Sequence, residues 1–213
     1  MEPTVHEGRR FLIEPSSQHG DVDGKIVASL ERLSQVFRVL LREEAQRRDL
    51  SPIQAQFLVH LLFHDVELRR VGRLAEEFNL TRATVSDAVG SLEKKGLIHR
   101  DPWLEDKRVV TLRLTPAGEK LATELSTWAN IVKEHLDSSS EEKEIVMRFL
   151  MRLIASLQRS GVITVARMCV TCRFFRQDLH PGSESPHHCA LLDLPLARSA
   201  LRVDCPEHEL AAS

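Results

Sequence analysis

The sequence lacks a long apolar run. No window of about 20 residues is free of charged side chains, so a membrane-spanning helix is not expected. The opening, MEPTVHEGRRFLIEPSSQHGDVDG, also lacks the cationic start and the apolar stretch of a signal peptide. These absences predict a protein of the cytoplasm with no membrane partner.

Catalytic signatures are scarce as well. The nine glycines are scattered without a phosphate-cradling loop, and no Ser-His-Asp context or paired-carboxylate arrangement stands out. The one Cys-x-x-Cys pair is not surrounded by a thioredoxin-like βαβ pattern. We therefore expect no enzyme activity, with a thiol-redox enzyme as a remote alternative.

The chain also has no excess of positive charge. Its 29 Lys and Arg oppose 31 Asp and Glu, so a surface for nucleic acid must come from cations gathered on one face. With 213 residues, 42% of them hydrophobic and 28% charged, the chain fits one soluble domain plus an appendage.

What the sequence does contain is a series of amphipathic helices. Residues 1–24 have little periodicity and predict a flexible arm, whereas apolar residues recur every three or four positions from 25 to 48, which predicts a long helix. Ser51-Pro52 is typical of the start of a second helix, running to about Leu62, and 71–80 predicts a third. The face of the long helix consists of Ile26, Val27, Leu30, Leu33, Val36, Phe37, Leu40 and Leu41.

A fourth helix is expected from an N-cap at Thr81 to Lys95, with Gly96 after its end. Its inward stripe is Val85, Ala88, Val89 and Leu92. A hairpin should follow, with strands at 97–98 and 109–114 around the charged loop RDPWLEDKR. Further helices are expected from Thr115-Pro116 through Ile131, and from Ile145 to Leu157.

Two helices, a tight turn and a hairpin, in that order, predict a winged helix-turn-helix. The fold class is mainly α (α+β), with long dimerisation helices and a small Cys-rich C-terminal tail. In this geometry the second helix of the pair enters the major groove of double-stranded DNA, and the hairpin flanks the backbone or minor groove. The candidate DNA-binding residues are Arg82, Ala83, Thr84, Ser86, Asp87, Lys107 and Arg108.

Residues 73–120, RLAEEFNLTRATVSDAVGSLEKKGLIHRDPWLEDKRVVTLRLTPAGEK, also resemble the core of MarR-type transcriptional regulators. The resemblance rests on the helix pair, the LEKKGLI turn, the D-K-R wing and the LTPAG that opens the next helix. It implies a homodimer with interlocking terminal helices, and repression or activation of transcription that is relieved by a small molecule, a metal or an oxidant. We expect a dimeric repressor. Asp87 departs from the basic residue that relatives often place after TVS.

The local charge is nearly balanced. Residues 68–108 contain nine Lys and Arg against seven Asp and Glu, so phosphate contacts are expected partly from backbone amides and helix N-termini. A protein-interaction role of the winged helix is the alternative to DNA binding.

All four cysteines lie in a C-terminal extension. The expected domains are thus an arm at 1–24, a winged helix and dimerisation domain at 25–160, and the extension at 161–213. Sixteen residues separate Cys172 from Cys189, and fifteen separate Cys189 from Cys205. About 50 residues with few large apolar side chains are commonly stabilised by a metal or by disulfides, and the latter are disfavoured in the cytoplasm. The candidate metal ligands are Cys169, Cys172, Cys189 and Cys205.

Three states of these cysteines are compatible with the pattern. Pro206 after the last cysteine is typical of iron–sulfur ligation, and Phe174 and Phe175 would shield a cluster from water. His187 or His188 replacing one sulfur would favour zinc. Free or reversibly oxidised thiols are the third state. A cluster or dithiol predicts a sensor, and zinc predicts a structural support.

Other candidates are weaker. His60 and His64, four residues apart on one helix, are a possible metal pair, although packed histidines are far commoner. Trp103 is expected to pack the hairpin. A cavity between the long helices and the DNA-binding domain would suit an aromatic effector, in which case the tail would hold a structural zinc. The core is expected to contain Phe37, Phe57, Phe63 and Phe78.

Overall fold

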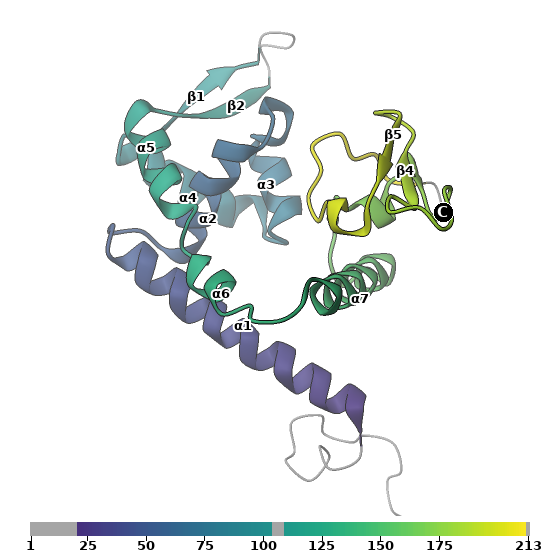
Figure 1. Cartoon of the computed structure of the whole chain (residues 1–213). Coiled ribbons are helices and arrows are strands. Elements are labelled where there is room, and N and C mark those ends of the chain that lie inside the picture. The colour runs from purple at the N-terminus through teal and green to yellow at the C-terminus, as the bar shows by residue number, and fades with distance from the viewer. Residues whose placement is uncertain (1–20, 104–108, 212–213) are drawn as a thin grey trace, which may run out of the picture.

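A computed structural model describes residues 21–103 and 109–211 (Figure 1). Its N-terminal part is the winged helix, in which the hairpin projects beyond the helices. Among the described residues, no helix is long and apolar enough to cross a membrane. The elements of this part are α1 (Val22–Gln46), α2 (Pro52–Phe63), the 3-10 turn η2 (Val66–Leu68), α3 (Val71–Glu77), α4 (Arg82–Lys94), β1 (Ile98–Pro102), β2 (Val110–Leu114), α5 (Pro116–Leu125) and α6 (Asn130–Glu134).

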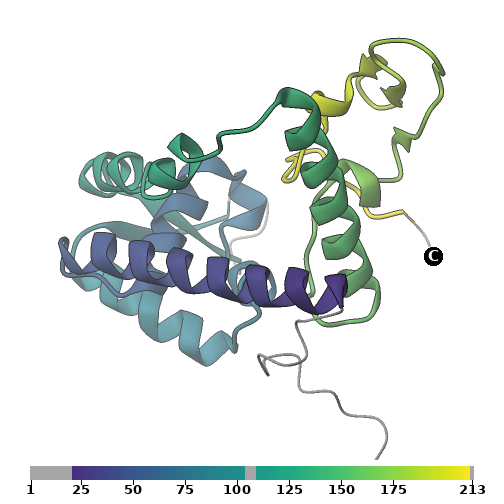
Figure 2. The same cartoon turned by 60° about the horizontal axis from the view of Figure 1, so that its bottom comes forward.

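The C-terminal part lies beside the winged helix in both views (Figures 1 and 2). The linker after α6 leads into α7 (Ser140–Arg159). After this helix the chain forms a small antiparallel sheet of order β3-β4-β5 and two 3-10 turns. These elements are η3 (Cys169–Thr171), β3 (Phe175–Arg176), β4 (His187–Cys189), β5 (Leu194–Leu196) and η4 (Arg198–Ala200).

Side-chain caps explain where the helices begin. Ser51 and Gln54 form a reciprocal capping box ahead of Pro52, and the hydroxyl of Thr81 accepts from the backbone amide of Thr84. Thr115 caps α5 in the same way. These starts confirm the sequence predictions for the three helices.

The main core joins α2, α3, α4, α5 and the hairpin. On α4, Val85, Val89 and Leu92 are fully buried, as predicted, and pack with Leu58, Leu74 and other members of one cluster. This packing fixes the outward face of α4, because side chains on opposite sides of a helix cannot be exchanged without rotating it. The remaining large, fully buried members are Phe57, Leu61, Ile98, Leu112 and Leu125.

Four predicted boundaries were wrong. Helix α1 begins at Val22, inside the arm expected at 1–24, because the side chain of Asp21 caps it. The helix expected through Ile131 ends at Leu125, because Ser126 and Thr127 donate their hydroxyls to the carbonyls of Thr123 and Glu124, a bond that competes with helix continuation. Strand β1 extends to Pro102 into the segment expected to be loop, since 98–102 pairs fully with 110–114. Helix α7 starts at Ser140, five residues early, because Ser139 and Glu142 form a capping box.

The prediction for the aromatic core holds for only part of the set. Phe57 is buried and makes an edge-to-face contact with the half-buried Phe78, with ring centroids 5.1 Å apart. Phe63, at the end of α2, is 65% exposed, and Phe37 on α1 is also exposed apart from an edge contact with Trp128. Both rings are therefore outside the buried core, and Phe63 is the more open of the two.

The apolar face of α1 is likewise left open. Only Leu41 of its predicted stripe is buried, whereas Val27, Leu33 and Val36 are exposed. Helix α7 has a similar open face. The apolar side chains exposed on α7 are Ile145, Val146, Phe149 and Leu157.

The C-terminal segment has a small core of its own. Met168, Ala166 and Leu201 are buried against Met151 and Ala155 of α7. The tail itself has few large apolar side chains, and α7 supplies the other half of this core, which no local sequence pattern predicts. The segment is therefore packed on a helix rather than extended alone.

Candidate nucleic-acid interface and cysteine cluster

The outer face of α4 is exposed along its first two turns. The fourth helix places Arg82, Ala83, Thr84, Ser86 and Asp87 in solvent, opposite its buried stripe. The hydroxyl of Thr84 lies 2.8 Å from that of Thr81, so it already has one partner at the N-cap. The helix thus presents cationic, hydroxyl and carboxylate groups side by side at its N-terminal end, where backbone amides add partial positive charge.

Arg82 is the most available cation of this face. Its guanidinium lies next to Gly72 of α3 and has no ion-pair partner among the described residues. Two neighbouring arginines are already paired: Arg73 with Glu76 at 2.8 Å, and Arg100 with Glu93 at 3.4 Å. The near balance of charge in the sequence therefore leaves Arg82 as the cation best placed to meet an anion.

Lys107 and Arg108, the predicted cations of the wing, lie outside the described residues, as does Asp106. Both strands of the hairpin are described, and Trp103 directly follows the end of β1. Trp103 packs under the guanidinium of Arg70, which sits 4.2 Å from the ring centroid, in agreement with the expected packing role.

The cysteines converge although they come from three separate segments. Cys169 and Cys172 bracket the turn η3, in which the amide of Cys172 donates to the carbonyl of Cys169 at 3.0 Å. Cys189 ends β4 and pairs with Phe175 of β3. Cys205 is held by a 2.9 Å bond from its amide to the carbonyl of Arg167.

All four cysteines line one small cavity of about 30 Å³. All are free thiols of intermediate burial. The other walls of this cavity are mainly apolar and are formed by Phe174, Phe175, Leu191, Leu192 and Leu196, with Glu207 beside Cys205. The sequence analysis expected all four cysteines to serve one site. The Cys-x-x-Cys spacing explains why Cys169 and Cys172 lie together, whereas tertiary packing brings Cys189 and Cys205 to the same cavity.

Positive groups approach two of the sulfurs. The amide of Arg202 donates to Cys169 Sγ at 3.2 Å, and the Arg202 guanidinium lies 3.6 Å from Cys205 Sγ. Burial raises the pKa of the Cys169 thiol and of the Cys205 thiol. Within 21–103 and 109–211, no three His, Cys, Asp or Glu side chains converge so that they could hold a metal ion as they stand.

The nearby histidines face other partners. His187 packs against Phe175 and accepts from the amide of Asp178 at 3.2 Å, while His188 contacts Asp193 and His180. Neither lines the cysteine cavity. The expectation that one of them replaces a sulfur finds no support in this arrangement.

His60 and His64 stack face to face, with ring centroids 3.9 Å apart. Burial, with help from His64, lowers the pKa of His60 to about 3, so this ring is neutral. A hydrogen bond to Asp204 raises the pKa of His64. The pair thus connects the core to the C-terminal segment, and sequence spacing alone gave no signal of Asp204.

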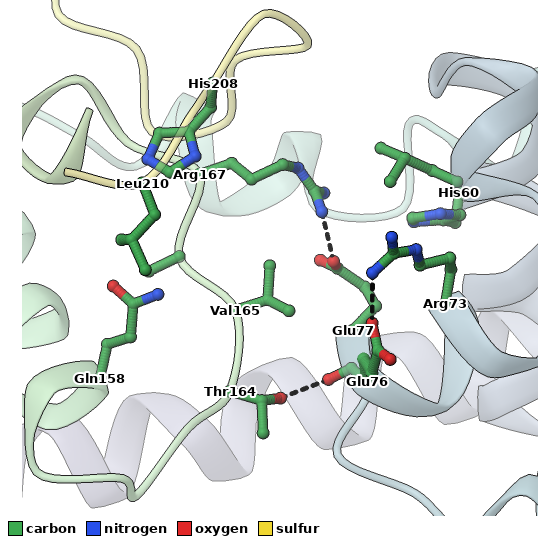
Figure 3. A pocket seen from close by; sticks show the side chains of 12 residues that line it. His60, Arg73, Glu76, Glu77, Gln158, Thr164, Val165, Arg167, His208 and Leu210 are labelled. Carbon is green, nitrogen blue, oxygen red and sulfur yellow. Dashed lines mark hydrogen bonds and ion pairs between the residues drawn. The ribbon is translucent and has the colours of Figure 1, made fainter. Parts of the chain in front are cut away.

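Two larger cavities adjoin this histidine pair. One, of about 370 Å³, lies between α1, α2 and α5 and includes Phe63, Phe78 and Trp128 in its walls. The other, of about 390 Å³, lies between the winged helix and the C-terminal segment and is the one in Figure 3. His60 contributes to both walls, and its Nε2 has no hydrogen-bond partner among the described residues.

Comparison with known proteins identifies the helix-hairpin region. The family model of the MarR family matches residues 64–110. The HTH-type transcriptional regulator YdgJ of Bacillus subtilis is 30% identical over 112 residues, which cover 52% of this chain and 59% of YdgJ. The HTH-type transcriptional repressor YetL of the same organism is 23% identical over 155 residues, covering 70% of this chain and 92% of YetL.

The solved structures agree with these relatives. The crystal structure of a MepR–DNA complex from S. aureus matches with a TM-score of 0.54 and 25% identity, over 62% of this chain and 96% of MepR. The transcriptional regulator PA3341 matches with a TM-score of 0.56 and 24% identity, over 63% of this chain and 98% of that one. The chain spans about three fifths of the length of YdgJ and of YhjH, a second HTH-type transcriptional regulator of Bacillus subtilis that is 30% identical over 103 residues. The described fold is therefore a winged helix of the type found in MarR-family regulators, followed by a cysteine-bearing segment packed on α7.

Proposed function

We propose that this chain is a sequence-specific DNA-binding transcriptional regulator of the MarR type, a dimeric repressor whose DNA affinity responds to a centre formed by its four cysteines. The observation that carries the DNA-binding part is the exposed N-terminal face of α4, whose opposite side is locked into the core by Val85, Val89 and Leu92. A rigid helix with a polar outer face fits the width of the major groove.

Each exposed group has a defined task in this proposal. Arg82 donates to a phosphate or to the O6 and N7 acceptors of guanine, and Ser86 bonds to bases or phosphates. Asp87 repels phosphate and accepts from a cytosine amine, which adds sequence preference rather than affinity. The likeness to MepR, which was solved bound to DNA, supports this orientation of the helix.

A dimer is supported by the open apolar faces. Val27, Leu33 and Val36 on α1, together with Ile145 and Phe149 on α7, expose large side chains that a second copy would bury. Two copies related by a twofold axis place two α4 helices at half-sites about one DNA turn apart.

Selection from a pool of random duplexes tests the DNA-binding role. We expect enrichment of a near-palindromic site with half-sites roughly 10 base pairs apart. Arg82→Ala should weaken binding to the selected site by about tenfold or more and relax one position of it, because a good base contact is worth about 1–3 kcal/mol. Fluorescence anisotropy of a labelled duplex gives the affinities.

Arg159→Ala is the matched control, since Arg159 is an exposed arginine at the far end of α7. It should bind like the unmodified chain. Failure of the selection to enrich any motif, or equal binding by Arg82→Ala and Arg159→Ala, would contradict the assignment of α4.

The cysteine centre is proposed to hold an iron–sulfur cluster. Four thiols around one cavity form an all-sulfur donor set, which suits iron–sulfur clusters and zinc, and the absence of His187 and His188 from its walls speaks against a mixed zinc site. Phe174, Phe175 and the three leucines would exclude water, and the Arg202 groups would offset thiolate charge. Because no three described ligand side chains converge closely enough to hold one ion as they stand, binding requires the four cysteines to approach one another.

A bound cluster would supply redox sensitivity, since its charge changes on oxidation and its ligation is lost on breakdown. Anaerobic purification with absorption spectroscopy and metal analysis tests this. We expect brown protein containing iron and sulfide, and colourless protein without metal for Cys172→Ser. Full metal content in Cys172→Ser would exclude this ligand, and stoichiometric zinc in the unmodified chain would replace the sensor with a structural support.

The second candidate effector is a small aromatic molecule. The 370 Å³ cavity walled by Phe63, Phe78 and Trp128 has the size and the apolar lining of such a site. In that case the cysteines would hold a structural zinc, and the metal analysis above would distinguish the two.

A further inference from the structure

The C-terminal segment meets the winged helix through a small set of polar contacts. Arg167 Nη1 lies 2.6 Å from Glu77 Oε2 on α3, and Thr164 Oγ1 donates to the carbonyl of Glu76 at 2.5 Å (Figure 3). The side chain of Arg167 is only 11% exposed, so this ion pair is shielded from solvent. Partly buried pairs of this kind are sensitive to small displacements because geometry decides their energy.

The same arginine is hydrogen-bonded to the loop that carries Asp204 and Cys205, here called the cysteine loop. Its carbonyl accepts from the amide of Cys205 at 2.9 Å, and its Nε donates to Asp204 Oδ1 at 2.9 Å. Asp204 immediately precedes Cys205, and Arg167 lies two residues before Cys169. Any movement of Cys205 or Cys169 is therefore passed directly to the backbone or side chain of Arg167.

A second arm of the network reaches α2. Asp204 Oδ2 lies 2.8 Å from His64 Nε2, and Arg167 Nη2 lies 3.0 Å from the same nitrogen. His64 Nδ1 donates to the carbonyl of His60, inside α2. The cysteine loop is thus linked to α2 through His64 and to α3 through Glu77.

The space beside these bonds is hollow. The cavity of about 390 Å³ in Figure 3 has Arg167 and Val165 on one wall and Glu77, Arg73 and His60 on the other. A close-packed apolar seam resists displacement, because movement would open voids and break many contacts. The contact between the winged helix and the C-terminal segment depends instead on a few hydrogen bonds and ion pairs. These two parts can therefore shift relative to each other at modest cost in free energy.

We propose that Arg167 transmits the state of the cysteine centre to the DNA-binding helices through its ion pairs with Glu77 and Asp204. This inference rests on the proposed function, since it requires both DNA binding and a centre that changes state. Loss of the centre frees Cys205 and Cys169, which displaces Asp204 and the backbone of Arg167. The ion pair between the Arg167 guanidinium and Glu77 on α3 then changes its geometry. Because α3 packs directly on α4, the α3–α4 unit reorients and the two recognition helices of the dimer change their separation.

The test compares the DNA affinity of the full chain with and without its centre. The unmodified protein, Arg167→Gln and Arg173→Gln are purified anaerobically, and half of each is treated with ferricyanide and EDTA to remove the metal. Arg173→Gln is the matched control, because Arg173 forms a 2.6 Å ion pair with Glu209 inside the C-terminal segment. Metal content and dissociation constants for the selected duplex are measured on all six samples.

We expect removal of the centre to change the affinity of the unmodified protein and of Arg173→Gln by about tenfold, within the usual range of allosteric coupling. In Arg167→Gln the change should fall to about twofold or less, with full metal content and retained DNA binding. Glu77→Gln breaks the same ion pair from the winged-helix side without touching the cysteine loop. Glu77→Gln should show the same loss of the change in DNA affinity on removal of the centre. If Arg167→Gln binds less metal than the unmodified protein, Glu77→Gln is the variant that tests the proposal.

The outcomes separate the two proposals. If Arg167→Gln and Glu77→Gln keep their metal and respond as strongly as the unmodified protein, transmission through this ion pair is wrong while the sensor stands. If the affinity of the unmodified protein does not change when its centre is removed, the sensor is wrong and nothing is left to transmit.

Discussion

At the scale of single residues, His60 shows how burial converts an ordinary side chain into a source of pH dependence. The ring is 5% exposed, stacks on His64 and touches the edge of Phe78. Burial lowers its pKa to about 3, whereas the unfolded chain binds the proton near the ordinary value of 6.5. The unfolded state therefore holds more protons between these two values, and stability falls as the pH falls below about 6.5.

We expect the His60 ring to contribute a drop of about 2 kcal/mol in the free energy of unfolding between pH 6.5 and 5, from roughly 1.4 kcal/mol per pH unit for one group. Urea unfolding at several pH values measures it. His60→Gln should remove most of this slope, although its stability at pH 7 will be lower because the stacked ring is lost.

His135→Gln serves as the comparison, since His135 is exposed on the turn after α6. It should keep the slope of the unmodified chain. Identical slopes in His60→Gln and His135→Gln would show that the buried ring does not carry the pH dependence.

At the scale of elements, Gly118 explains the LTPAG stretch that opens α5. Its amide donates to the hydroxyl of Thr115, and a Cβ at this position would lie 1.9 Å from the carbonyl oxygen of Leu97. That carbonyl also accepts from the amide of Thr115, so it cannot move without breaking the junction of β1, β2 and α5.

Gly118→Ala should therefore destabilise the chain by about 2–3 kcal/mol or more, although alanine favours helices, because the backbone must shift to relieve the overlap. Gly90→Ala in α4 is the matched control, since a Cβ there meets no atom within 4 Å. It should stabilise by about 0.5–1 kcal/mol. Chemical denaturation gives both values, and a stabilised Gly118→Ala would disprove the close approach.

At the scale of the whole molecule, the chain consists of two packed parts and two open apolar faces. The main core holds the winged helix, and the smaller core holds the cysteine segment on α7. The exposed stripes of α1 and α7 belong to neither core, and in the proposed dimer a second copy would cover them. The spacing of half-sites in the selected DNA is the observable consequence, because it reports the distance between two α4 helices held by that interface.

The same scale separates the proposed DNA-reading part from the proposed sensing part. The polar contact around Arg167 and Asp204 is small beside the two cores, and a cavity lies next to it. Such a contact allows the parts to move as units, so control of DNA affinity does not require unfolding of either.

The sequence by itself determined the winged helix. Its signals are helix periodicity, the inward stripe of α4 and the caps at Ser51, Thr81 and Thr115. They can be read from the sequence because caps and amphipathic faces act over only a few residues. Where equally local hydroxyl bonds opposed the periodicity, at Ser126 and Thr127, the apolar pattern gave the wrong helix end.

Only the tertiary structure decided which distant residues meet. It brought Cys189 and Cys205 to the cavity of Cys169 and Cys172, left Phe63 exposed, and joined His64 to Asp204 across 140 positions of the chain. Spacing in sequence cannot specify such meetings, because they depend on how α7 and the small sheet pack as bodies rather than on the properties of any one segment.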